Sequence, residues 1–170
     1  MQNTPSLLGQ GVNLFPPPEP ILYRPNVAAI LRKPTGEILV AERLTVDNAW
    51  QFPQGGVDDG ESMTEALVRE LEEEIGVTAN LITVVREKGG YRYAFPKGRL
   101  KYGIYGGQEQ TYFLCDFHGT DDDIHLDRHH REFSQFKWVQ PGEFRLDWVP
   151  KFKRPTYTAV FRDFFDIVLE

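Results

Sequence analysis

The segment "QFPQGGVDDGESMTEALVRELEEEIGV", from Gln51 to Val77, places three glutamates within five residues, shortly after a glycine-rich turn. Glu70, Glu73 and Glu74 come late in what the spacing predicts to be a helix. Glutamates three or four positions apart on a helix repel one another, at a cost of about 0.2–0.5 kcal/mol for each pair. Carboxylates near the C-terminus of a helix also oppose its dipole. The arrangement is therefore locally unfavourable and needs a compensating partner.

The helix itself is predicted from both of its ends and from its apolar face. Ser62 and Glu65 match a capping box at the start, and Gly76 is well placed to end the helix. Four apolar residues fall on a single arc at helical spacing: Met63, Leu67, Leu71 and Ile75. The three glutamates share a neighbouring arc, and Glu74 falls just inside the apolar one. A buried carboxylate in that position costs more unless it is paired.

Two interpretations of the glutamates remain open at this point. Arg69 can pair with Glu73 at i,i+4, but one cation does not balance three anions. In the first interpretation, the glutamates form a solvated acidic face. In the second, a divalent metal ion compensates their charge, since Mg²⁺ takes carboxylate, water and phosphate oxygens as ligands. The glycine turn favours the second, because it can bring a bare carbonyl close to the glutamates and a loop close to a phosphate; its glycines are Gly55, Gly56 and Gly60.

The composition argues against several classes of protein. The chain has 170 residues, 41% of them hydrophobic and 26% charged, which fits one globular domain with a sizeable core. A net charge of -6 argues against broad binding of duplex DNA, although a small basic pocket for one phosphorylated ligand remains compatible with it. Cys115 is the only cysteine, so no internal disulfide forms. No apolar run approaches the roughly 20 residues of a membrane span, and no secretory signal is visible. We therefore expect no membrane association and a cytoplasmic location.

Strand and helix patterns mix irregularly along the chain. Residues 1–22 lack periodicity and contain "FPPPEP", which favours polyproline geometry. We expect an extended or flexible arm there and a single domain over residues 23–170. Strands are predicted in "NVAAILRK", "EILVAER", "AWQFP", "NLITVVRE", "YRYAFP", "QEQTYFLCDF" and "EFSQFKWV", and a second helix in "RPTYTAVFRDFFDIVL". This mixture predicts an α/β fold with a mixed sheet and helices on its faces.

The glycine turn and the helix together resemble the signature of a known family. Gly55 is followed by five residues and Glu61, and then by seven residues and Arg69-Glu70-Leu71. One residue later come Glu73-Glu74, and after one more residue Gly76-Val77. This pattern resembles the complete signature of the Nudix hydrolases, with every fixed position filled. The resemblance implies a Nudix-type α/β/α sandwich with the catalytic loop–helix–loop at residues 55–77.

The resemblance also implies an activity and a set of roles. Nudix enzymes hydrolyse a nucleoside diphosphate linked to another group, using Mg²⁺ or Mn²⁺. Glu61 and Arg69 are implied to hold the loop and to orient a glutamate. Metal ions in such a site neutralise the diphosphate and lower the pKa of a bound water, whose proton passes to a carboxylate. The implied metal ligands are the Gly55 carbonyl and the carboxylates of Glu70, Glu73 and Glu74.

Segments outside the signature resemble one branch of the family, which holds bacterial RNA 5′-pyrophosphohydrolases and plant-type asymmetrical dinucleoside tetraphosphatases. The resemblance runs from about Tyr23 to the C-terminus and includes "YRPNVAAIL", "GGQEQTYFL" and "FKRPTYTAVFRDF". In this branch, the glutamate before the late strand is an extra metal ligand or base, and that position here is Glu132. The implied substrate-binding residues are Arg24, Arg43, Tyr93, Gln110, Phe152 and Lys153.

The chain departs from the branch between Gly107 and Tyr112. The branch usually reads Gly-Gln-x-Gln-Lys-Trp, and Thr111 stands here in place of the lysine, which removes a cation from the phosphate path. Three cations of the basic, aromatic-rich tract before it are possible replacements: Lys97, Arg99 and Lys101. The aromatic residues nearby either stack on a base or pack against the sheet, and both interpretations stay open: Tyr91, Tyr93, Tyr102 and Phe152.

Three histidines lie in the segment "DDDIHLDRHHREF", close to several aspartates. The spacing of His125, His129 and His130 matches no standard structural metal site. We therefore expect a solvated polar loop, which can still border the substrate cleft because it precedes Glu132.

The leading hypothesis is a pyrophosphohydrolase of dinucleoside polyphosphates, with Mg²⁺ as the expected cofactor and Mn²⁺ as an alternative. It would cleave diadenosine tetraphosphate to ATP and AMP. The segment "FKRPTY" and the loop length favour it slightly over the alternative, removal of pyrophosphate from the 5′-triphosphate end of RNA. A non-catalytic nucleotide sensor is less favoured, because such modules usually lose signature glutamates. The sequence predicts no oligomeric state.

Overall fold

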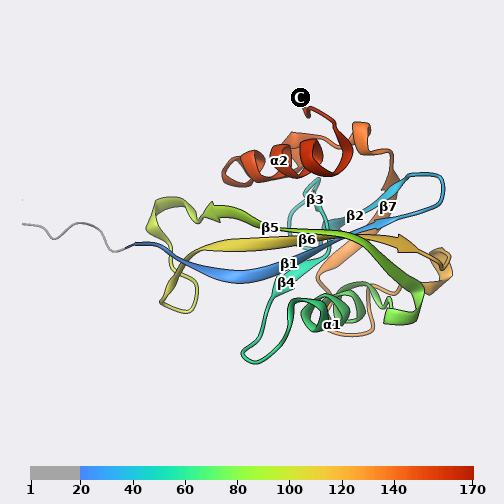
Figure 1. The fold of residues 1–170 in the computed structure, drawn as a ribbon, viewed down its shortest axis with the longest axis horizontal. Helices are drawn as coiled ribbons and strands as arrows, with labels where there is room; N and C mark the ends of the chain where they lie inside the picture. The colour runs from blue at the N-terminus through green and yellow to red at the C-terminus, as the bar shows by residue number, and fades with distance from the viewer. Residues whose placement is uncertain (1–19) are drawn as a thin grey trace, which may run out of the picture.

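The computed structural model describes residues 20–170, which form one seven-stranded sheet with a helix on each face (Figure 1). The strands are β1 (Leu22–Arg32), β2 (Ile38–Arg43), β3 (Trp50–Gln51), β4 (Gln54–Gly56), β5 (Ile82–Ala94), β6 (Tyr105–Phe117) and β7 (Phe133–Val139). The helices are α1 (Met63–Ile75) and α2 (Arg154–Phe165). Six short 3₁₀ turns join these elements: Ala79–Leu81, Pro96–Gly98, Asp121–Asp123, Pro141–Glu143, Leu146–Trp148 and Lys151–Lys153.

The sheet is mixed, as the sequence predicts. Its strand order is β3-β2-β1-β6-β5, with β4 paired to β1 and β7 paired to β2. β1 and β6 run parallel, while the other pairs are antiparallel. Asn26 of β1 stands between Gly56 of β4 and Gln110 of β6 in register. This pairing fixes the glycine turn beside the middle of the sheet.

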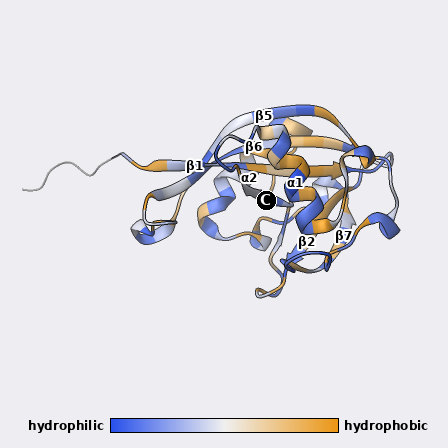
Figure 2. Ribbon diagram, turned by 90° about the horizontal axis from the view of Figure 1, so that it is seen from below, coloured by the Kyte–Doolittle hydropathy of each residue, from blue (hydrophilic) through white to orange (hydrophobic). Residues whose placement is uncertain are grey.

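Both faces of the sheet are covered by hydrophobic side chains, which is why an α/β/α sandwich forms. Successive residues of a strand point to opposite faces, and both sets in β1 are buried. Ala28 and Ile30 belong to the core under α2, whereas Val27 and Ala29 belong to the core under α1. Figure 2 looks onto α1 from below and shows hydrophobic residues along the strands behind it.

The ends of α1 follow the predicted local interactions. The Ser62 hydroxyl accepts a hydrogen bond from the Glu65 amide at 3.1 Å, and the Glu65 carboxylate accepts one from the Ser62 amide at 3.4 Å. Gly76 ends the helix with φ 71°, in the left-handed region that glycine adopts most easily. Leu67, Leu71 and Ile75 are buried, and Met63 is exposed.

Several sequence predictions differ from the structure in their boundaries, and three of the differences concern β5, α2 and the arm. The strands predicted in "NLITVVRE" and "YRYAFP" form one continuous strand, β5, because its partner β6 pairs with both halves across a bulge between Lys88 and Tyr91. α2 ends at Phe165, since Asp166 adopts a left-handed conformation, and Val168 is exposed. Leu22, at the end of the predicted arm, already belongs to β1. The rest of the arm lies mainly in residues 1–19, outside the described residues, so its extended or flexible character stays a prediction.

The sheet extends beyond both helices at one end, on the left in Figure 1. This end consists of the start of β1, the end of β5, the start of β6 and the loop between the last two strands. Within residues 20–170, no helix is long and apolar enough to cross a membrane.

Candidate active site

The glycine turn lies so close to two charged side chains that a larger residue would displace them. A Cβ added to Gly55 would overlap the Glu70 carboxylate, and one added to Gly56 would overlap the Arg24 guanidinium. β4 is paired to β1 on one side and packs against α1 on the other. Two adjacent glycines therefore bring the backbone into contact with an anion of the helix and a cation of the sheet.

Arg69 ties the turn to the helix through a network of charged hydrogen bonds. Its guanidinium donates to the two Glu61 carboxylate oxygens at 2.7 and 2.8 Å, to Glu70 at 2.8 Å and to the Gly56 carbonyl at 2.8 Å. The predicted pair with Glu73 is longer, at 3.3 Å. The hydrogen bonds from Arg69 lower the pKa of Glu61 to about 2, so Glu61 stays ionised. Arg69 therefore holds the turn against the helix, and the supporting roles that the resemblance implies for Glu61 and Arg69 stay a prediction.

Glu70 and Glu74 form a partly buried pair of carboxylates beside the turn. Burial raises the pKa of Glu70, and it raises the pKa of Glu74 well above its ordinary value. The neighbouring charge of Glu70 raises the pKa of Glu74 further. Glu74 accepts a hydrogen bond from the Gln54 amide at 3.2 Å. Because Arg69 donates to Glu70, Glu74 is the carboxylate of this pair that depends most on another source of positive charge.

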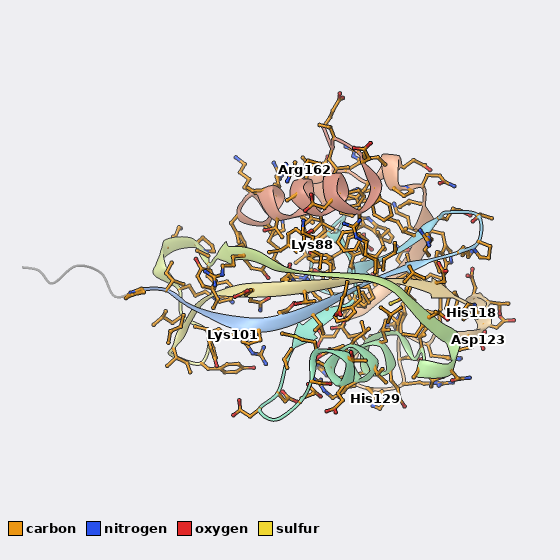
Figure 3. All side chains as sticks on the ribbon, in the orientation of Figure 1. Lys88, Lys101, His118, Asp123, His129 and Arg162 are labelled. Atoms are coloured by element: carbon orange, nitrogen blue, oxygen red, sulfur yellow. The ribbon has the colours of Figure 1, made fainter. Side chains whose placement is uncertain are left out.

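Two more glutamates complete the acidic cluster from the solvent side. Glu73 and Glu132 are exposed, and together with Glu70 and Glu74 they line a small cavity of about 110 Å³. His129 and His130 line the same cavity, and Figure 3 labels His129 beside α1. The histidine loop thus borders the glutamates, as its position before Glu132 allows. His125 instead anchors the loop, since its amide donates to the Ile75 carbonyl at 2.7 Å.

The acidic cluster fits a hard divalent cation by its chemistry, although its side chains do not converge into a closed ligand set within residues 20–170. All its donors are oxygens, the type that Mg²⁺ prefers, and Mg²⁺ keeps several waters and substrate oxygens rather than requiring a full protein cage. The missing Cβ of Gly55 leaves the backbone directly against Glu70. Arg69 provides the cluster with one cation for four carboxylates.

A larger cleft of about 470 Å³ leads from this cluster across the sheet. Glu70, Glu74 and Glu132 line it beside Gly55 and Gly56. Five cations line the same cleft: Arg24, Arg43, Arg99, Lys101 and Lys153. The cleft therefore combines carboxylates suited to a metal ion with cations suited to phosphate groups.

Lys153 is a partly buried cation of this cleft. Burial, followed by the charges of Arg43 and Lys101, lowers its pKa to about 8. Its Nζ lies 5.3 Å from the ring centroid of Tyr93, and Tyr93 packs edge-on against Phe152 at 5.6 Å. Both aromatic residues line the cleft. Tyr91, by contrast, packs under α2 and donates to Asp163 at 2.8 Å, so it belongs to the core.

Gln110 has a different position from the other predicted substrate-binding residues, because it is fully buried beneath the cleft. It donates to Asn26 at 2.8 Å and to Gln54 at 2.6 Å, and it accepts from Tyr112 at 2.9 Å. Asn26 and Gln54 line the cleft, so any effect of Gln110 on a ligand passes through them. Neither Asn26 nor Gln54 was predicted from the sequence, because both are placed by the register of β1 with β4, which the sequence does not give.

Comparisons with known proteins agree with this geometry. A NUDIX domain model matches residues 22–160. The chain is 44% identical to an RNA pyrophosphohydrolase of Erythrobacter litoralis (strain HTCC2594) over 157 residues, covering 88% of this chain and 95% of the relative. It is 40% identical to an RNA pyrophosphohydrolase of Helicobacter pylori (strain G27), covering 84% and 93%.

Solved structures show the same fold at low sequence identity. The E. coli dihydroneopterin triphosphate pyrophosphohydrolase is 18% identical with a TM-score of 0.59, covering 81% of this chain and 96% of that one. A C. elegans Ap4A hydrolase is 21% identical with a TM-score of 0.54, covering 83% and 99%. The chain therefore belongs to the Nudix family and is a pyrophosphohydrolase, a hydrolase of phosphoanhydride bonds.

Proposed function

We propose that this chain removes pyrophosphate from the 5′-triphosphate end of RNA, with Mg²⁺ bound by the glutamates that line the cleft. The observation that carries the proposal is the cleft itself, which joins the glutamates of α1 to five cations. A 5′-triphosphate needs both kinds of group. The glutamates would hold the metal, which would supply positive charge to the reacting phosphate, and the cations would neutralise the remaining phosphates.

The relatives support RNA as the substrate over a dinucleoside polyphosphate. Both curated relatives described above are named RNA pyrophosphohydrolase, and each is matched over more than nine-tenths of its length. The sequence slightly favoured the dinucleoside polyphosphate as substrate. The comparisons instead favour the alternative, the 5′-triphosphate end of RNA. The Ap4A hydrolase structure, at 21% identity, supports the shared fold alone.

In the proposed reaction, water attacks a phosphorus atom of the triphosphate and the bond to the bridging oxygen between the α- and β-phosphates breaks. The products are a 5′-monophosphate RNA and pyrophosphate. Mg²⁺, when bound, neutralises phosphate oxygens and lowers the pKa of water. A carboxylate of the acidic cluster accepts the water proton. Arg69 holds Glu70 in place through its 2.8 Å hydrogen bond, and Arg24 and Lys153 donate to phosphate oxygens.

Side-by-side turnover tests the proposal. One reaction measures pyrophosphate released from triphosphorylated RNA, and the other measures ATP and AMP formed from diadenosine tetraphosphate, both with Mg²⁺. We expect kcat/KM to be higher for RNA. Faster cleavage of diadenosine tetraphosphate would reverse the assignment, and cleavage of a sugar nucleotide alone would exclude both substrates.

A further inference from the structure

We propose that the loop joining β5 and β6, residues 95–104, binds the unpaired nucleotides that follow the triphosphate end of an RNA substrate. This inference rests on the proposed function, since it extends the same substrate beyond the cleft. We call residues 95–104 the β5–β6 loop. It forms the tip of the part of the sheet that projects beyond both helices (Figure 1).

The β5–β6 loop is positively charged in an acidic protein. The chain carries a net charge of -6, yet no acidic residue occurs between Lys88 and Gln108. Lys88 and Arg92 in this stretch pair with Asp163 and Glu109. The remaining three cations lie in the loop, and none of them forms an ion pair within residues 20–170: Lys97, Arg99 and Lys101. Their charges are available to a polyanion.

The loop is continuous with the cleft. Arg99 and Lys101 line the cleft together with Gly55 and Glu70, and Figure 3 labels Lys101 at this end of the sheet. Lys97 lies farther along the loop and does not line the cleft. A chain whose triphosphate occupies the cleft therefore passes Arg99 and Lys101 before it reaches Lys97.

Tyr102 provides an exposed aromatic ring next to these cations. Its exposed fraction is 70%. The Arg24 guanidinium lies 5.1 Å from the centroid of the ring, and the Lys101 ammonium lies 5.6 Å from it. Arg24 in turn lies against Gly56. The ring is thus held beside the glycine turn by a cation of the cleft, and much of its surface remains open to a ligand.

Exposed aromatic rings beside unpaired cations fit single-stranded nucleic acid. Bases stack on aromatic rings without requiring a sequence, and cations follow the phosphates. Four exposed apolar side chains occur in the loop and just before and at the start of β1, at the same end of the sheet: Ile21, Leu22, Leu100 and Ile104. Continuity with a phosphate-binding cleft favours RNA over a second copy of the chain, which itself carries a net charge of -6.

The test compares two triphosphorylated substrates, a dinucleotide and an unpaired RNA of about twelve nucleotides, across four variants. The measured quantity is the ratio of kcat/KM for the long RNA to kcat/KM for the dinucleotide. Tyr102→Ala removes the ring, and Tyr102→Phe keeps it at the same backbone position. Lys97→Gln removes a charge of the loop, and Lys33→Gln removes one beyond the other end of β1.

We expect the wild-type ratio to be about thirtyfold, the product of about tenfold from stacking of one base and about threefold from the charge of Lys97. Tyr102→Ala should lower the ratio to about threefold, while Tyr102→Phe and Lys33→Gln leave it unchanged. Lys97→Gln should lower the ratio by about threefold and weaken its dependence on salt. Equal losses on both substrates would overturn the inference, since the loop would then act only on the triphosphate. An unchanged ratio in Tyr102→Ala would also overturn it. So would a wild-type protein that is a dimer and a Tyr102→Ala variant that is a monomer, because the surface would then join two copies of the chain.

A binding measurement separates failure of this inference from failure of the proposed function. If wild type releases no pyrophosphate from either RNA, the proposed function fails. Fluorescence anisotropy with the same unpaired RNA carrying a 5′-hydroxyl end then reports on the loop without turnover. The inference is supported if wild type and Tyr102→Phe bind this RNA at low salt and Tyr102→Ala binds it with an affinity at least fivefold lower. Equal binding by all three would exclude it.

Discussion

Adding one methyl group at Gly55 should inactivate the enzyme while leaving its fold intact. A Cβ at this position would overlap the Glu70 carboxylate, whereas ordinary contacts with a Cβ begin at about 3.4 Å. The carboxylate must therefore move away by more than about 1 Å. Such a displacement of a catalytic group costs on the order of 10² in rate, or about 2.7 kcal/mol of transition-state stabilisation. Because the displaced atoms are the end of a flexible side chain, the melting temperature should change little.

The neighbouring glycine offers a matched comparison for this prediction. A Cβ at Gly56 would overlap the Arg24 guanidinium instead, so Gly56→Ala should weaken binding of the triphosphate and mainly raise KM. Gly142 has open space around its Cβ position, so Gly142→Ala serves as the control with unchanged kinetics. The assay is pyrophosphate release from triphosphorylated RNA, with kcat and KM determined separately. A Gly55→Ala enzyme with wild-type kcat would refute the claim that the position of Glu70 matters for catalysis.

Three further predictions follow from the site. Glu73→Gln should reduce kcat by at least about 100-fold with an unchanged circular dichroism spectrum; a variant that loses only nucleotide affinity would indicate a sensor. Because burial lowers the pKa of Lys153 to about 8, the free enzyme loses this charge as pH rises through 8. KM for RNA should therefore rise over that range in wild type and stay flat in Lys153→Arg, and parallel profiles would contradict this role. Gln110→Leu should lower the free energy of unfolding by about 1–3 kcal/mol, because Asn26 and Tyr112 lose a buried hydrogen-bond partner. Urea denaturation measures this change, and a variant as stable as wild type would show that the hydrogen bonds of Gln110 are not required for stability.

The sequence predicted α1 well because its determinants are local. The capping box joins Ser62 to Glu65, and the end of the helix depends on Gly76 alone. The partly buried position of Glu74 also followed from helical spacing. The hydrogen bonds between Arg69 and Glu61 were harder to predict from helical spacing. Glu61 lies eight residues before Arg69 and outside the helix, in a turn whose path a helical pattern does not describe.

Features that depend on strand pairing were harder to predict. Gly89 and Gly90 interrupt the strand pattern in the sequence, yet β6 is long enough to bridge them as a bulge, so two predicted strands are one. Gln108 and Gln110 share a face of β6 by alternation. Only the pairing of β1 with β4 and β6 shows that Asn26 and Gln54 cover Gln110.

Titration calorimetry with Mg²⁺ and Mn²⁺, in the presence of a non-hydrolysable triphosphate, tests the central claim most directly. Wild type is expected to bind the metal, and the double variant Glu70→Gln, Glu74→Gln is not, because it lacks the two partly buried carboxylates of the predicted ligand set. Wild-type protein that takes up neither metal under these conditions would contradict the account.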